Sequence, residues 1–276
     1  MSKHYLILDT ETTIPAFLKD FSDNSDISIS KPLVYDIGWV IYSPNSPFII
    51  KRNYLVKETA NLIDLAYYSD KKEEYLKMLD KGEILYESWD NIMEALSIDI
   101  SIFEISAVCA YNAAFDFKKA IPFTERYVKA LYSNHFDYWA KRQKERCQKI
   151  LDGTAEKHKN PTFLNPVFKI RDIEVPIVDI WGLAVDNFAT REEYKDFCLT
   201  NKYFSKYFST SAETMYRYLN KNTDFIESHT ALDDAVIETE ILDRLIQETE
   251  IKPQMRSFPF KKVGKVNEFI KSREKK

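Results

Sequence analysis

The hydrophobic pattern of the chain predicts five strands separated by amphipathic stretches. Tyr5–Leu8 is continuously apolar, as expected of a strand that is covered on both faces. Leu33–Tyr42 and Phe48–Val56 are two further strands, and a short turn rich in serine and proline between them favours an antiparallel hairpin. Two more apolar runs, Ile105–Tyr111 and Val175–Ile180, complete the set. The first three strands are therefore expected to be neighbours.

The helices are expected in the stretches between and after these strands. Ala231–Glu248 is the clearest, because apolar residues recur there with a period close to 3.6. Ser88–Phe103 is amphipathic, and Ser88 is a candidate N-cap residue. The other expected helices cover the charged stretch Asn61–Leu85, the residues after Asp116 to about Leu131, the beginning of a helix at Trp181–Val185, and Ser211–Leu219. Lys19–Lys31 is polar and is expected to be a surface loop.

The composition excludes several classes of protein. A chain of 276 residues, 45% hydrophobic and 14% aromatic, can bury a sizeable core and form one large domain or two small ones. It has only five glycines and contains neither GxGxxG nor GxxxxGK[ST], which argues against a glycine-rich phosphate loop. There is no apolar run of about 18 residues and no visible signal peptide, so we expect no membrane span.

The cysteines indicate a reducing environment. Cys109, Cys147 and Cys198 are odd in number and scattered, with no CxxC pair, so they are interpreted as free thiols rather than a disulfide frame or a zinc site. We therefore expect a cytoplasmic protein. The abundance of Lys, Asn, Ile and Tyr is typical of an AT-rich genome, which leaves open a phage-encoded protein acting in a bacterial cytoplasm.

Two segments are basic although the net charge of the chain is −4. Tyr132–Lys169, a helical insertion, carries seven Lys or Arg residues from Lys141 to Lys159, and is either a solvated helix or a basic, aromatic wall along a nucleic-acid groove. The C-terminal segment, residues 252–276, has nine Lys or Arg against two Glu, a net of +7. It is interpreted as either a solvated tail or an arm that contacts phosphates.

A pair of acids ends the first strand. Asp9 and Glu11 lie two positions apart, so their side chains project from the same face. Neighbouring carboxylates repel each other, and burial increases the energetic cost. A cation would relieve it, and an oxygen-only ligand set suits Mg²⁺ or Mn²⁺. The alternative is an ordinary acidic strand end that faces water.

Two other segments provide the groups that this pair lacks. Asn112–Asp116 (NAAFD) lies where an apolar strand gives way to a helix, and His229–Asp234 (HTALDD) leads into the long final helix. Each lies at the end of an element, where open sheets place their sites. Four carboxylates and one histidine match hydrolysis of a phosphodiester by two metals about 3.5–4 Å apart. A histidine can take a proton from the attacking water near neutral pH.

The order of these motifs, DxET, NxxFD and HxAxxD, resembles that of the DEDDh 3′→5′ exonucleases. This family includes the proofreading subunit of bacterial replicative polymerase, oligoribonuclease and RNase T. The resemblance covers roughly residues 4–120 and 175–248, and includes Tyr35–Val40 and Ile177–Ile180 as similar strands. It implies an RNase H-like α/β fold, with a mixed five-stranded sheet flanked by helices, over residues 1–250. The basic segment from 251 to 276 would follow this domain as a C-terminal tail.

The resemblance also implies roles for individual residues. The metal ligands for two Mg²⁺ or Mn²⁺ ions would be four carboxylates, and His229 would be the general base. The HxAxxD register selects Asp234 rather than Asp233. The ligands would be Asp9, Glu11, Asp116 and Asp234, and the positions that line the terminal nucleotide would be Thr12, Ile14, Asn112 and Phe115.

Some positions depart from the family's pattern. Tyr111 stands where many members have histidine, and the insertion at about 132–169 is longer than in compact members, which affects substrate choice rather than the chemistry. Asp36 and Asp179 are interpreted as structural or peripheral.

The implied function is release of nucleoside monophosphates from the 3′ end of a single strand, with DNA favoured. The alternatives are an RNA exonuclease, a proofreading subunit that acts in trans with a replication or repair partner, and a non-catalytic nucleic-acid-binding protein. The sequence does not decide between DNA and RNA, because that discrimination depends on 2′-OH contacts.

Overall fold

The sheet at the centre of the molecule is seen in a computed structural model that describes residues 3–13, 31–44, 46–65, 69–134, 136–154, 163–256 and 258–274. Within these residues the strand order is β4-β3-β2-β1-β5-β8-β9-β6, with β7 paired to β8. β1 is antiparallel to β2 and parallel to β5, and β5 is parallel to β8. The strands are β1 (His4–Thr12), β2 (Val34–Ser43), β3 (Ser46–Val56), β4 (Leu85–Glu87), β5 (Ile105–Ala110), β6 (Phe163–Leu164), β7 (Val167–Ile170), β8 (Ile173–Asp179) and β9 (Gln254–Met255).

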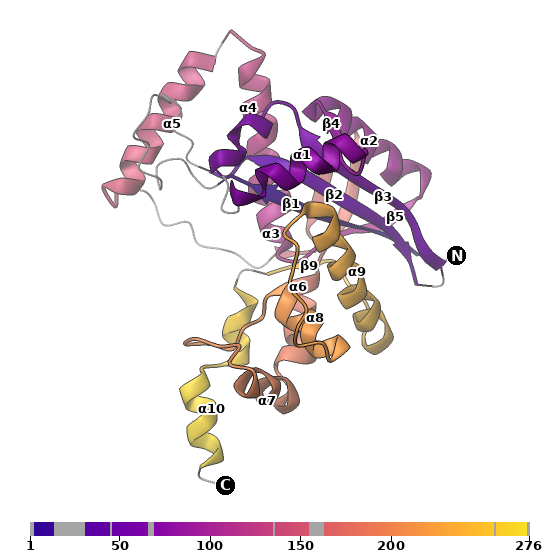
Figure 1. Ribbon diagram of the computed structural model, residues 1–276, viewed down its shortest axis with the longest axis vertical. Coiled ribbons are helices and arrows are strands. Elements are labelled where there is room, and N and C mark those ends of the chain that lie inside the picture. Colours follow the sequence, from indigo (N-terminus) through magenta and orange to yellow (C-terminus); the bar gives the residue numbers. More distant parts are fainter. Residues whose placement is uncertain are drawn as a thin grey trace.

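Helices cover both faces of this mixed sheet (Figure 1). One face carries α2 (Trp89–Ile102), the π-helical turn η4 (Asp116–Ala120) and α4 (Ile121–Leu131). The other carries α9 (Ala231–Glu248) and the smaller helices drawn below it. Those smaller helices are α6 (Ile180–Ala184), η5 (Val185–Ala189), α7 (Glu192–Thr200), α8 (Ala212–Asn220), η6 (Pro259–Val263) and α10 (Val266–Arg273). The α/β fold with parallel and antiparallel strands is therefore as expected.

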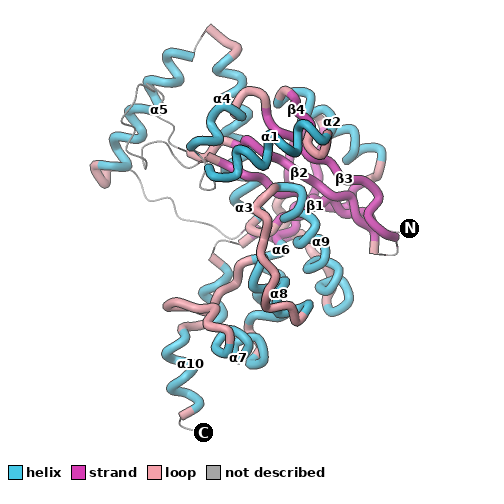
Figure 2. The backbone as a smooth tube through the Cα atoms, viewed as in Figure 1, coloured by secondary structure: helices cyan, strands magenta, loops and turns pink. Residues whose placement is uncertain are grey.

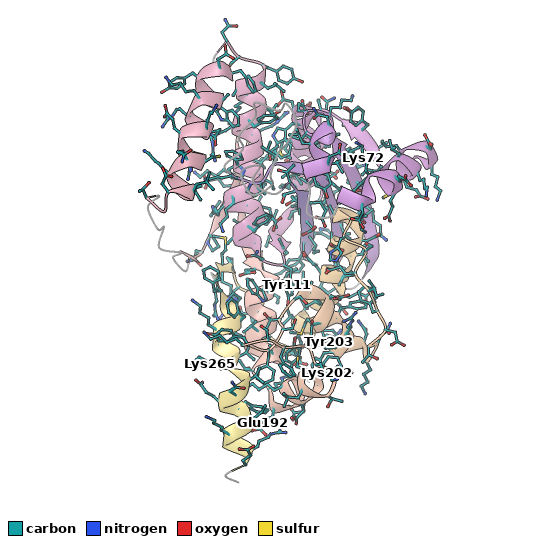
Figure 3. All side chains as sticks on the ribbon, turned by 60° about the vertical axis from the view of Figure 1, so that its left-hand side comes forward. Lys72, Tyr111, Glu192, Lys202, Tyr203 and Lys265 are labelled. Atoms are coloured by element: carbon teal, nitrogen blue, oxygen red, sulfur yellow. The ribbon has the colours of Figure 1, made fainter. Side chains whose placement is uncertain are left out.

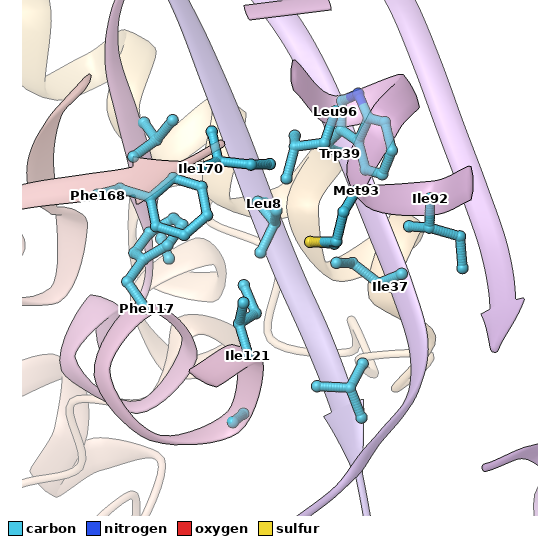
Figure 4. Packing of buried hydrophobic residues seen from close by; sticks show 14 of the residues in the cluster. Leu8, Ile37, Trp39, Ile92, Met93, Leu96, Phe117, Ile121, Phe168 and Ile170 are labelled. Carbon is cyan, nitrogen blue, oxygen red and sulfur yellow. The ribbon is translucent and has the colours of Figure 1, made fainter. Parts of the chain in front are cut away.

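The alternation along β1 divides the core into two layers. Leu6 and Leu8 pack with α2 and α4, whereas Tyr5 and Ile7 pack with α6, α8 and α9. Figure 4 shows the first layer, in which Leu8 lies beside Phe117 of η4. The rings of Phe117 and Phe168 are 5.0 Å apart. Because side chains in a strand alternate, the odd-numbered residues of β1 face α9.

The long strands and the long helix α9 closely match the prediction. α9 spans Ala231–Glu248, and Ser88 caps α2 by accepting a hydrogen bond from the amide of Asn91. The expected five strands form the centre of the sheet as β3, β2, β1, β5 and β8, and shorter strands extend it on both sides (Figure 2). The expected loop at Lys19–Lys31 lies outside the described residues except for Lys31.

The stretch 61–85 is less helical than expected. It contains the 3₁₀ turns η2 (Ala60–Leu65) and η3 (Ser69–Lys71), and a single α-helix, α1 (Lys72–Lys81), before β4 begins at Leu85. α1 ends at Gly82, which has a φ of 70° and donates its amide to the carbonyl of Leu79. Glycine adopts this left-handed conformation without steric strain, so it terminates the helix.

The two basic segments differ in how they are built. The described residues of the insertion form one helix, α5 (Phe136–Leu151), followed by β6 and by β7, which pairs with β8. The described part of the C-terminal segment packs against the domain, because Met255 in β9 is fully buried and Val263 and Val266 join the core layer beneath α9. Its Arg256 and Lys262 form ion pairs with Asp186. These residues are thus a folded part of the domain rather than a free tail.

None of the helices in the described residues is long and apolar enough to cross a membrane. Cys109, Cys147 and Cys198 are buried and form no disulfide, as expected.

Candidate active site

The acids of β1 face the N-terminal end of α9. Asp9 and Glu11 are partly buried and share a strand face with Tyr5 and Ile7, which contact the α9 layer. In the β1–β2 ladder, Asp9 lies opposite Gly38 and Glu11 lies opposite Asp36. Both carboxylates therefore project into the space between the sheet and α9.

Two residues of β2 hold α9 close to the sheet. A Cβ atom added at Gly38 would lie 2.4 Å from the backbone nitrogen of Leu232, so only glycine allows this approach. Asp36 is fully buried and accepts hydrogen bonds from the amide of Ala231 (2.9 Å) and the hydroxyl of Tyr75 (2.8 Å). Burial raises the pKa of Asp36 to about 6 although these bonds favour the charged form. Asp36 thus positions the start of α9.

α9 brings two carboxylates to the site from successive turns. Asp234 and Glu238 are four residues apart on one helix face and are 7% and 2% exposed. Glu238 accepts a hydrogen bond from the amide of Tyr111 at the end of β5 (3.0 Å). Tyr111 lies at the waist of the molecule, between the sheet and the helices below it (Figure 3). The buried Oδ1 atom of Asp234 has no hydrogen-bond partner among the described residues.

Asp116 enters the site from the other layer. It is 2% exposed, begins η4, and accepts a hydrogen bond from the hydroxyl of Thr10 (2.6 Å). Thr10 lies between Asp9 and Glu11, so β1 also fixes the orientation of Asp116. Asn112, just after β5, has a φ of 74°, a conformation that is uncommon for residues other than glycine.

These carboxyl groups share one electrostatic environment. Burial is the largest cause of a raised pKa in each of them: well above the ordinary range for Asp9, about 8 for Glu11, about 7 for Asp116 and about 9 for Asp234. Neighbouring carboxylates raise the pKa of Asp9, Glu11 and Asp234 further. The cluster therefore accumulates negative charge that protons or a cation must neutralise.

His229 lies on the loop that leads into α9. Its Nδ1 atom is 4.0 Å from Oδ2 of Asp234 and 3.7 Å from Oε2 of Glu227. Its backbone has a φ of 54°, so the loop turns sharply there. Burial and then the charge of Lys71 lower the pKa of His229, which favours the neutral imidazole at neutral pH.

The remaining predicted residues lie around this cluster. Thr12 is half-buried at the end of β1, and Phe115 is half-buried in α3 (Ala113–Phe115), where it packs against the core layer of α2 and α4. Ile14 lies outside the described residues. Asp233 instead accepts hydrogen bonds from the hydroxyls of Ser228 and Thr230 (3.0 Å each) at the start of α9. Of these two adjacent acids, Asp234 therefore lies in the carboxylate cluster and Asp233 lies against the loop before α9.

Asp179 is fully buried and accepts hydrogen bonds from backbone amides. It ends β8 and accepts a hydrogen bond from the amide of Arg256 (3.1 Å). Burial raises its pKa to about 6, while the amides of Arg256 and Gly182, and then those of Ala113 and Asn112, lower it. Asp179 therefore holds backbone segments together, including the loop that carries Asn112.

Three residues near the cluster were not predicted from the sequence. Glu238 has the strongest effect on Asp9, because after burial it is the largest contribution to the raised pKa of Asp9. Burial and then Glu213 raise the pKa of Glu227 to about 7, and Lys71 lowers the pKa of Glu11. The i, i+4 spacing of Asp234 and Glu238 on a buried helix face was the available signal for Glu238.

The donor set fits divalent cations that prefer oxygen. Glu11, His229 and Asp234 each offer one ligand atom within 4.8 Å of the others. The unpartnered Oδ1 atom of Asp234 and the mutual repulsion of the carboxylates are both relieved by a bound cation. The preponderance of carboxylate oxygens favours Mg²⁺ or Mn²⁺ over zinc.

Two of the comparisons with known proteins found no match, and the third found similar solved structures. No protein-family model matches the chain, and no curated protein matches it. Among solved structures, the chain is similar to the crystal structure of cell-death related nuclease 4 (CRN-4), at 15% sequence identity and a TM-score of 0.48. The match covers 89% of this chain and 64% of the nuclease, so this chain spans less than two thirds of that protein's length.

Proposed function

We propose that the protein is a metal-dependent 3′→5′ exonuclease of the DEDDh type that hydrolyses single-stranded nucleic acid and releases nucleoside monophosphates. The observation that carries the proposal is the convergence of Asp9, Glu11, Asp116 and Asp234 from three segments of the chain, with His229 4.0 Å from Asp234. These four carboxylates would hold two Mg²⁺ or Mn²⁺ ions.

The chain's own residues then have distinct roles. When bound, the ions would lower the pKa of an attacking water and stabilise charge on the phosphodiester. The neutral imidazole of His229 would accept the proton from that water. Thr10 holds the carboxylate of Asp116, and Asp36 and Gly38 hold α9 and so Asp234. Thr12, Ile14, Asn112 and Phe115 would surround the terminal nucleotide.

The test is degradation of a labelled single strand by the full chain with Mg²⁺ or Mn²⁺. A 5′-labelled strand should shorten one nucleotide at a time, and a 3′-terminal phosphorothioate linkage should slow the first step. Asp9→Asn and Asp116→Asn should be inactive, whereas Asp233→Asn should retain turnover. Cleavage within the strand, or degradation from the 5′ end, would overturn the proposed polarity.

The same assay distinguishes the related alternatives. Matched DNA and RNA strands decide between a deoxyribonuclease, which we favour, and an exoribonuclease. A mispaired 3′ end that is removed faster than a paired one would indicate proofreading in trans. Strand binding with no metal-dependent release would indicate a non-catalytic binding protein.

A further inference from the structure

A basic groove lies between α4 and α5, outside the carboxylate cluster. Its volume is about 550 Å³. Five cations and one carboxylate, Glu145, line it together with apolar and aromatic side chains. The cations are Lys31, Arg126, Arg142, Arg146 and Lys149.

These five cations share the groove without an ion-pair partner in the part of the chain that the structure describes. Among the described residues, none of the five forms an ion pair with a carboxylate. Lys31 is the most enclosed, and burial followed by the charges of Arg146 and Arg126 lowers its pKa. By contrast, Lys169 and Arg171, which line the adjacent pocket beside β7, pair with Glu174 and Glu94. Uncompensated like charges that face one groove indicate an anionic ligand.

The floor of the groove is aromatic. Phe123 of α4 and Trp139 of α5 have ring centroids 5.9 Å apart, and Lys31 and Arg126 each lie 5.8 Å from the centre of the Phe123 ring. On α5, Trp139, Arg142 and Arg146 follow one another at intervals of three and four residues, so one helix face presents them all. Basic side chains interleaved with aromatic ones are typical of surfaces that bind single-stranded nucleic acids.

Two consecutive helical elements, η4 and α4, run from the carboxylate cluster to the groove. Asp116 begins η4, α4 continues it, and Phe123 and Arg126 lie seven and ten residues further along. At about 1.5 Å per residue, these positions are roughly 10–15 Å from Asp116 along the axis. Lys119, one turn after Asp116, also lowers the pKa of Lys31, so positive charge extends from the cluster towards the groove.

We propose that the α4–α5 groove binds the phosphate backbone of a single-stranded nucleic acid, on the stretch that precedes the 3′ nucleotide in the carboxylate cluster. The placement of the strand's end rests on the proposed function, whereas the binding of a phosphate backbone rests on the groove itself. The partner is therefore a strand long enough to reach from Asp116 to α5, and a strand of one or two nucleotides would not engage it.

The test compares two pairs of substitutions on the same helix. Arg142→Gln with Arg146→Gln removes two charges from the groove. Lys141→Gln with Lys144→Gln removes two charges from exposed positions of α5 that do not line it. Binding of fluorescent oligo(dT) and oligo(U) of about 20 nucleotides, longer than most single-strand sites, is measured in EDTA over a range of salt concentrations.

The variant with Arg142→Gln and Arg146→Gln should bind both strands roughly tenfold more weakly at low salt. Because each lost phosphate contact changes the slope of log K against log salt by about 0.7, the loss of two contacts should flatten it by about 1.4. The control pair should bind as the wild type does. Equal slopes for the two pairs, a loss confined to one type of strand, or binding of phosphatidylserine vesicles in place of either oligonucleotide would overturn the proposal.

The outcomes also separate this inference from the proposed function. Because binding is measured without metal, a wild-type protein that binds through the groove but never degrades the strand would remove the nuclease assignment and leave the groove. If the wild-type protein degrades the strand and the variant with Arg142→Gln and Arg146→Gln binds it normally, the nuclease assignment would stand and the groove proposal would be overturned.

Discussion

Replacing Asp234 with asparagine should stabilise the metal-free protein while it abolishes activity. Burial, together with Glu227, Glu11 and other acids, raises the pKa of Asp234 to about 9. At pH 7 the unfolded chain has this group ionised, whereas the folded metal-free protein holds it protonated. Protonation over the three units between its ordinary pKa and pH 7 costs about 4 kcal/mol. Asparagine is neutral in both states and avoids this cost.

The net gain is smaller than the electrostatic cost. Oδ1 of Asp234 has no hydrogen-bond partner among the described residues, so the amide of asparagine would also bury a polar atom, at about 1–3 kcal/mol. We therefore expect a stabilisation of about 1–3 kcal/mol. For a domain of this size, that corresponds to a rise in Tm of about 2–5 °C.

The assay is thermal unfolding at pH 7 and pH 8, first in EDTA and then with Mg²⁺ in place of EDTA. Asp233→Asn is the matched control, because the hydroxyls of Ser228 and Thr230 both donate to Oδ2 of Asp233 and the amide oxygen of asparagine can accept the same bonds, so its Tm should stay close to that of the wild type. Mg²⁺ should raise the Tm of the wild type and of Asp233→Asn but not that of Asp234→Asn. A lower Tm for metal-free Asp234→Asn than for the wild type would refute the reasoning.

Three further predictions concern the same site. Because Glu11, Asp116 and Asp234 have pKa values of about 8, 7 and 9, the folded metal-free protein binds more protons than the unfolded chain. Its Tm should therefore fall as pH rises from about 4 to 9, and Mg²⁺ should restore more stability at pH 8 than at pH 6. A Tm that rises with pH in EDTA would contradict this. His229→Ala should reduce single-turnover cleavage by about 10²–10⁴-fold without weakening Mg²⁺ binding measured by calorimetry, and near-normal cleavage would exclude it as the base. Gly38→Ala should displace α9 and lower both Tm and turnover, because its Cβ would lie 2.4 Å from the nitrogen of Leu232; an unchanged Tm would show that the helix yields at no cost.

The sequence predicted the site's segments better than its surroundings. The strand carrying Asp9 contains a continuous apolar run and the helix carrying Asp234 has a clear helical period, so the positions of both could be inferred from neighbouring residues alone, although β1 continues to Thr12. The HxAxxD register distinguished Asp234 from Asp233, and the structure places Asp234 in the cluster and Asp233 at the helix start.

The parts that could not be predicted depend on contacts between distant segments. Glu238 reaches the cluster because α9 packs on β1 and β2, and its partner, the amide of Tyr111, is 127 positions away. Local composition described the C-terminal segment as a basic tail, whereas β9 (Gln254–Met255) joins the sheet between β8 and β6. The groove cations come from α4, α5 and Lys31, which lies three residues before β2, and no short window of sequence contains them all.

The docking of α9 on β2 makes the site a late product of chain synthesis. The hydrogen bond between Asp36 and Ala231 joins residues 195 positions apart, and the bond between Thr10 and Asp116 joins residues 106 positions apart. An emerging chain can therefore orient Asp9, Glu11 and Asp116 long before Asp234 and His229 leave the ribosome. If the cluster is a nuclease centre, a chain that ends before His229 would lack both this residue and Asp234 of α9 and should not degrade nucleic acid.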